Sequence, residues 1–101
     1  MTNVNSVLKE RGSRYGDFSE HAEITQTLKN YLKEQLSKRN KVLAPDQQEA
    51  LDMICHKIGR IINGDANYAD SWIDIEGYAT LVADRLERDL ERDKVQNGIT
   101  S

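Results

Sequence analysis

Apolar residues recur at three- and four-residue steps along most of this chain, the period of an amphipathic α-helix. The pattern predicts four helices. The first covers about residues 3–11, and the second runs from Asp17 to the basic stretch at residues 38–41. The third covers about residues 45–63, and the fourth about residues 70–94. We therefore expect an all-α fold, a small helical bundle of about four helices.

Residues with strong terminal preferences mark the ends of these segments. Asp17 is placed to cap the second helix, with Glu20 three residues on as in a capping box. Pro45 suits the first turn of the third helix, and Gly64 its C-terminal end. The predicted buried stripes are Ile24, Leu28, Tyr31, Leu32 and Leu36 on the second helix, and Leu51, Ile54, Cys55, Ile58, Ile61 and Ile62 on the third.

The fourth segment carries two apolar surfaces where a simple surface helix has one. The first consists of Trp72, Ile75, Ala79, Val82, Leu86 and Leu90, and the second of Ile73, Gly77 and Leu81. A small bundle has few ways to cover both surfaces internally, so the pattern predicts self-association, most simply a two-fold dimer. Gly77 is expected to permit close approach of another backbone or a ligand.

Composition supports one cytoplasmic domain. The 101 residues include 38% hydrophobic and 31% charged residues and a single proline, and no apolar run reaches the roughly 20 residues of a membrane span. Cys55 is the only cysteine, which excludes an intrachain disulfide and suits a reducing compartment. The net charge of −3 argues against nonspecific DNA binding by the whole surface and against a nucleic-acid partner, while leaving a local basic patch open. We expect a helical domain over residues 1–94 and a flexible tail over residues 95–101.

Four acidic residues have helical spacing on the third and fourth segments. They are Glu49 and Asp52 on the third, and Asp70 and Asp74 on the fourth. If the helices pack antiparallel, the four carboxylates could converge on Mg²⁺, which prefers oxygen ligands. Each also has a structural interpretation: a solvated charged face for Glu49 and Asp52, an N-cap for Asp70, and for Asp74 an arginine or lysine partner or helix N-terminal amides.

Four short segments of the chain resemble motifs of the MazG-like all-α nucleoside triphosphate pyrophosphatases. In chain order they are Glu49-Ala-Leu-Asp52, Gly64-Asp65, Asp70-Ser-Trp-Ile-Asp74 and Gly77-Tyr78. The resemblance covers roughly the C-terminal half. It implies two acid-x-x-acid pairs on consecutive helices and magnesium-dependent cleavage of a nucleoside triphosphate to monophosphate and pyrophosphate. The second pair departs from that pattern, because Ser71 stands three residues before Asp74. A second resemblance rests on Arg14-Tyr-Gly-Asp-Phe18, His21 and Asp70-Ser-Trp-Ile-Asp-Ile-Glu-Gly-Tyr78. Through these residues the whole chain looks like small proteins of tailed bacteriophages and prophages, which would place it in the host cell cytoplasm.

The enzyme hypothesis gives further residues a role. Magnesium would be held by Glu49, Asp52 and Asp74, with Asp70 as a fourth ligand or an orienting group. Nucleotide phosphates would be neutralised by basic side chains. The substrate-binding candidates are Arg11, Arg14, Tyr15, Lys57, Arg60 and Tyr78, with Tyr15 able to stack on a base. The catalytic candidates are Lys57 and His56, and His56 either relays a proton or pairs with Asp52.

Two other classes of function fit the same residues. A binding module without turnover would sequester a nucleotide, or dock on a host protein as a phage effector. A purely structural adaptor would use only the apolar surfaces of the fourth helix.

Overall fold

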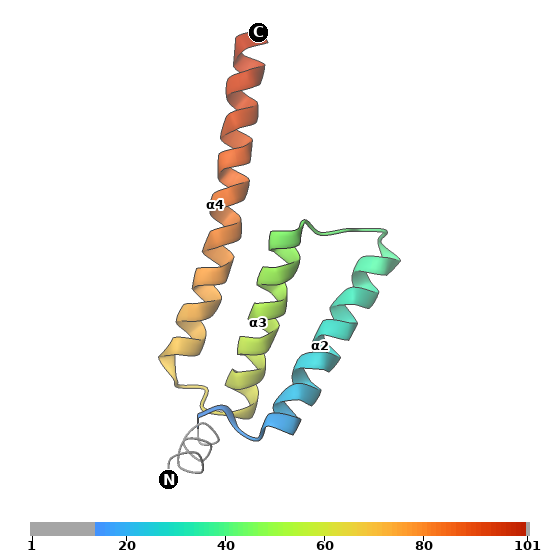
Figure 1. Cartoon of the computed structure of the whole chain (residues 1–101), viewed down its shortest axis with the longest axis vertical. Coiled ribbons are helices and arrows are strands. Elements are labelled where there is room, and N and C mark those ends of the chain that lie inside the picture. Colours follow the sequence, from blue (N-terminus) through green and yellow to red (C-terminus); the bar gives the residue numbers. More distant parts are fainter. Residues whose placement is uncertain (1–13, 101) are drawn as a thin grey trace, which may run out of the picture.

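The structure, a computed structural model, describes residues 14–100 and contains three α-helices and no strand within that range. Helix α2 spans Phe18–Lys38, α3 spans Pro45–Asn63 and α4 spans Ala69–Thr100 (Figure 1). The all-α prediction is confirmed, as are the second, third and fourth predicted helices. The first predicted helix, at residues 3–11, lies outside the described residues. Helix α4 continues through Thr100, beyond the end at residue 94 that the sequence suggested.

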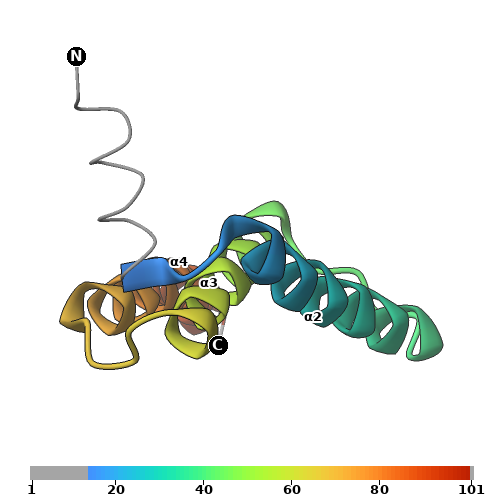
Figure 2. The ribbon, with the colours of Figure 1, turned by 90° about the horizontal axis from the view of Figure 1, so that it is seen from below.

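The three helices form a single layer with α3 in the middle. Helix α3 packs against α2 on one side and α4 on the other, while α2 and α4 do not touch each other (Figures 1 and 2). Successive helices run antiparallel, and the molecule measures 67 × 30 × 25 Å along its principal axes. The expected bundle would enclose a core between its helices. Within residues 14–100 the helices instead form one open layer.

The helix ends follow the predicted signals. The Asp17 carboxylate accepts hydrogen bonds from the Glu20 backbone N–H at 3.4 Å and from the Ser19 hydroxyl, and both bonds lower the pKa of Asp17. At the start of α3 the Gln47 side chain accepts from the Ala44 N–H at 2.9 Å. At the C-terminal end of α3 the Gly64 N–H donates to the Arg60 carbonyl at 2.9 Å.

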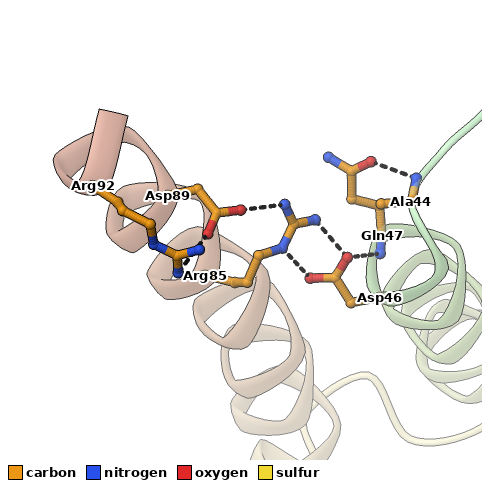
Figure 3. Close-up of polar contacts among 6 residues, drawn as sticks. All are labelled: Ala44, Asp46, Gln47, Arg85, Asp89 and Arg92. Atoms are coloured by element: carbon orange, nitrogen blue, oxygen red, sulfur yellow. Dashed lines mark hydrogen bonds and ion pairs between the residues drawn. The ribbon is translucent and has the colours of Figure 1, made fainter. Parts of the chain in front are cut away.

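An arginine on α4 fastens the start of α3. Arg85 donates two parallel hydrogen bonds to Asp46, at 2.9 Å from Nε and 2.6 Å from Nη2, and a third to Asp89 at 3.1 Å (Figure 3). This pairing lowers the pKa of Asp46 and raises that of Arg85. It sets the position of α4 along α3, so the C-terminal part of α4 extends past the N-terminal end of α3 (Figure 1).

Burial is slight for a chain of this length. Among the described residues the buried apolar side chains are Ala50, Cys55 and Ile61, and no large side chain is fully buried. Three residues of the predicted buried stripes, Tyr31, Leu51 and Ile62, are exposed. The reason is geometric: in a single layer each stripe can bury only the part that faces a neighbouring helix.

Candidate functional site

The four predicted acidic ligands do not converge within one copy of the chain. In residues 14–100, no three His, Cys, Asp or Glu side chains lie close enough together to hold a metal ion. Asp52 Oδ1 accepts from the Gln48 amide at 3.1 Å, Asp70 Oδ2 accepts from the Tyr68 hydroxyl at 2.9 Å, and Glu49 is exposed.

Lys57, and not an acidic residue of α3, reaches the acidic side of α4. Its ammonium lies 2.8 Å from Asp74 Oδ2, and the lysine is buried while the aspartate is half-exposed. Five helical residues separate Asp52 from Lys57, which turns the two side chains about 140° apart around the helix. The lysine partner is therefore the alternative that holds for Asp74. Because the Lys57 ammonium is already paired with Asp74, Lys57 is poorly placed for the phosphate-binding and catalytic roles predicted for it.

His56 pairs with another histidine instead of with Asp52. Its Nδ1 lies 3.2 Å from Nε2 of His21 on α2, and the two rings meet edge to face with their centroids 4.6 Å apart. Burial, followed by the charge of Arg60, lowers the pKa of His56 to about 4, and burial also lowers the pKa of His21. Both imidazoles are consequently neutral at pH 7, and His56 is a weak general base there.

The two histidines lie at a close contact between α2 and α3. At Gly59 a Cβ atom would lie 2.5 Å from the Thr25 hydroxyl and 2.8 Å from the His21 ring. Only a residue without a side chain fits this crossing. The histidine pair therefore belongs to a helix contact, although His56 remains only half-buried.

Two arginines and two tyrosines gather at the end of α3. The guanidinium carbon of Arg60 lies 4.1 Å from the ring centroid of Tyr15, and that of Arg14 lies 5.0 Å from the centroid of Tyr68. The two tyrosine rings meet edge to face at 6.1 Å. We call Arg14, Tyr15, Arg60 and Tyr68 the arginine–tyrosine cluster. Its members come from the segment before α2, from α3 and from the loop before α4.

A backbone junction holds the cluster together. The side-chain amide of Asn63 donates to the Tyr15 carbonyl at 3.2 Å and to the Asp17 carbonyl at 2.8 Å. Gly16 has a φ of +79°, which L side chains rarely adopt. A Cβ at Gly64 would lie 2.4 Å from the Tyr15 Cα, so a glycine is needed there for close approach. The junction passes over the ends of α3 and α4 on one side of the layer (Figure 2).

The cluster contains three of the predicted substrate-binding residues: Arg14, Tyr15 and Arg60. Tyr78 lies on α4, one turn beyond Asp74, and is half-buried; Arg11 lies outside the described residues. Sequence reasoning missed Tyr68 and Asn63. Tyr68 lies in a loop, where no periodicity indicates its role. For Asn63 a signal existed, since Gly16 and Gly64 indicate a tight junction between their segments.

The comparisons with known proteins place the chain in a family without indicating an activity. The chain belongs to the family described as a domain of unknown function (DUF6378), whose model matches residues 1–86. The comparison with curated proteins found no match, and neither did the comparison with solved structures. Among the described helices, none combines the length and apolar character needed to cross a membrane.

Proposed function

We propose that this protein binds a nucleotide at the arginine–tyrosine cluster. The observation that carries the proposal is the stacking of Arg60 on Tyr15, beside Arg14 and Tyr68. Guanidinium groups bind phosphate oxygens through paired N–H donors, and aromatic and guanidinium planes both accept a stacked base. A cluster that offers both features suits a ligand with a phosphate and a base.

The cluster combines a fixed frame with access from solvent. Asn63, Gly16 and Gly64 hold its backbone, and Tyr68 is fixed by its hydrogen bond to Asp70, which raises the pKa of the phenol. Arg14 is exposed, and Tyr15, Arg60 and Tyr68 are half-buried. A site that is ordered before binding loses less entropy when a ligand arrives.

Binding without turnover is the form of the proposal that one copy of the chain supports best. The ammonium of Lys57 is already paired with Asp74, and the pKa of His56 is too low for efficient proton transfer at pH 7. Of the two non-enzymatic classes, this favours a module that sequesters a nucleotide.

Ligand titrations test the proposal. Isothermal titration of the full chain with ATP, GTP, the deoxynucleoside triphosphates and inorganic tripolyphosphate should give binding to at least one nucleotide. Arg60→Gln should weaken it at least tenfold, because a hydrogen bond to a charged group is worth about 1.5–3 kcal/mol. Tyr15→Leu should weaken nucleotide binding while leaving tripolyphosphate binding nearly unchanged.

Arg88→Gln is the matched control, since Arg88 is an exposed arginine on α4 away from the cluster. If Arg88→Gln weakens binding as much as Arg60→Gln, the interaction is with overall charge and the assigned site is wrong. The absence of any nucleotide binding at micromolar protein would overturn the proposal.

One observation favours a second candidate, the magnesium-dependent pyrophosphohydrolase of the MazG-like resemblance. Glu49, Asp52 and His56 occupy the same side of α3 as Arg60, by their spacing of three, four and four residues. Eight residues along a helix are about 12 Å, so a triphosphate bound at Arg60 would extend toward Asp52. Two carboxylates with phosphate oxygens form a common magnesium set, and Glu49 and Asp52 fit it. Asp70 and Asp74 fit less well, given their bonds to Tyr68 and Lys57.

Bound magnesium would supply charge neutralisation on the phosphates and a lowered pKa for a coordinated water. Nucleoside triphosphates with Mg²⁺ should then release pyrophosphate, and Asp52→Asn should abolish release while leaving magnesium-free nucleotide binding intact. Binding without release of pyrophosphate would leave sequestration as the function. In either case the chain would act in the cytoplasm of a phage-infected or lysogenic host.

A further inference from the structure

The side of α3 opposite the arginine–tyrosine cluster is apolar. Three apolar residues of α3 lie about 180–200° around the helix from Arg60. They are Leu51, nine residues before Arg60, Ile58, two before it, and Ile62, two after it. Arg60 contacts Tyr15 on one side of the layer, so these three residues point to the other side. Leu51 and Ile62 are exposed there.

Helix α4 continues the same apolar surface. Trp72, Leu86 and Leu90 share one stripe of the helix, which lies about 120–160° around α4 from Asp74, the residue that meets Lys57 of α3. Since α4 runs antiparallel to α3, this stripe lies on the same side of the layer as Leu51, Ile58 and Ile62. We call these six residues the apolar face. Tyr31 on α2 is exposed and borders it by the same geometry.

The apolar face leaves a large part of the hydrophobic side chains of the layer in contact with water, which is unfavourable for folding. The described residues bury few apolar side chains, and none of the large ones is fully buried. Hydrophobic burial is the main favourable contribution to folding, and it must offset a conformational entropy cost of similar size. A single layer of three helices therefore needs a second layer against its apolar face.

We propose that the apolar face is the interface with a second copy of this chain. Helix α3 is about 28 Å long by its 19 residues, and two packed helices are together about 20 Å wide, so the part of the layer formed by α3 and α4 measures roughly 560 Å². Each partner of a stable interface contributes about 600 Å² at the lower end of the usual range. An interface related by a two-fold axis uses the same patch on both copies, and an uncharged face has no like charges to oppose each other.

The overhang of α4 supports this occupant. Leu90 and Val95 are exposed beyond the point where Arg85 meets the start of α3. A helical extension that packs on no other described helix tends to fray, because isolated short helices are marginal in water. A second copy that overlaps this end of α4 would cover the extension, and two-fold symmetry would cover the partner's extension in the same way.

Sedimentation velocity of the full chain between 1 and 100 μM tests the interface. The sedimentation data should give the wild-type protein a molar mass of twice the 11.5 kDa of one chain over most of this range. Ile62→Glu and Leu90→Glu should each raise the dimer dissociation constant at least tenfold. Leu81→Glu is the matched control: Leu81 is 67% exposed, as Ile62 is, but lies about 180° around α4 from Leu90. Circular dichroism will report whether each variant remains helical.

A second measurement needs no variant. Trp72 is 54% exposed in one copy, so acrylamide should quench its fluorescence more strongly as dilution dissociates the dimer. A wild-type chain that is monomeric at 100 μM, or a dimer that Leu81→Glu disrupts and Ile62→Glu does not, would overturn the proposal. A chain that dimerises only after residues 1–13 are deleted would also overturn it, because that segment would then be the natural cover. Nucleotide binding at Arg60 is measured separately, so either proposal can fail alone.

Discussion

At the scale of single residues, neighbours on adjacent helices decide the chemistry of the charged groups. Asp74 meets Lys57, Asp46 meets Arg85, and His56 meets His21. The sequence suggested the types of partner for Asp74 but not which side chain would arrive. Helical spacing gives the face on which a residue lies, and it does not say which face meets the next helix.

The histidine pair should make stability depend on pH. The pKa of His56 falls from 6.5 to about 4 on folding, so between these values the unfolded chain binds more protons than the folded one. Stability is then complete above pH 6.5 and decreases as the pH falls through this window. At pH 5 the loss relative to pH 7 is about 2 kcal/mol, which urea unfolding can measure.

His56→Gln removes the titrating group and should flatten the dependence between pH 6.5 and 5. The charged groups around the pair are Lys29 on α2 and Lys57 and Arg60 on α3. A variant with the same pH slope as the wild-type protein would show that the acid sensitivity arises elsewhere.

At the scale of elements, terminal signals located the helices well. Asp17, Pro45 and Gly64 each occupy the helix end that the sequence assigned to them. The acidic site was harder to predict because it required the rotation of α3 relative to α4. Lys57 and Arg85 fix that rotation, and neither carries a local sequence signal of its role.

Two glycines test the packing between elements. Gly59→Ala should destabilise the fold by about 1–3 kcal/mol, because the added methyl group meets the buried Thr25 and His21 side chains. Gly77→Ala is the control and should stabilise α4 by about 1 kcal/mol, since no described atom lies within 4 Å of a Cβ there. Thermal and urea unfolding of both variants will check this.

The sequence suggested that Gly77 allows a close approach, but within one copy its surroundings are open. If Gly77→Ala destabilises the protein in solution, a partner must reach this side of α4. If Gly59→Ala leaves stability unchanged, the crossing of α2 and α3 is looser than described.

At the scale of the whole molecule, the layer has two unlike sides. Composition and periodicity predicted helices with more apolar surface than they could bury, and α4 supplied the clearest sign through Trp72, Leu86 and Leu90. Periodicity could not predict an open layer, because contacts between particular helices decide whether a bundle closes.

Self-association should appear as a concentration dependence of thermal stability. Because dimerisation stabilises the folded chain by mass action, the melting temperature of the wild-type protein should rise steadily between 1 and 100 μM. Ile62→Glu should melt lower and with less dependence on concentration. A melting temperature that is constant across this range would mean that the folded chain is stable on its own.

The placement of Arg60 and Ile62 on opposite sides of α3 sets the stoichiometry of any complex. Two layers joined back to back would present two ligand sites outward, with no residue shared between them. Saturation should therefore be hyperbolic, at one nucleotide per chain, and occupancy of one site should leave the affinity of the other unchanged.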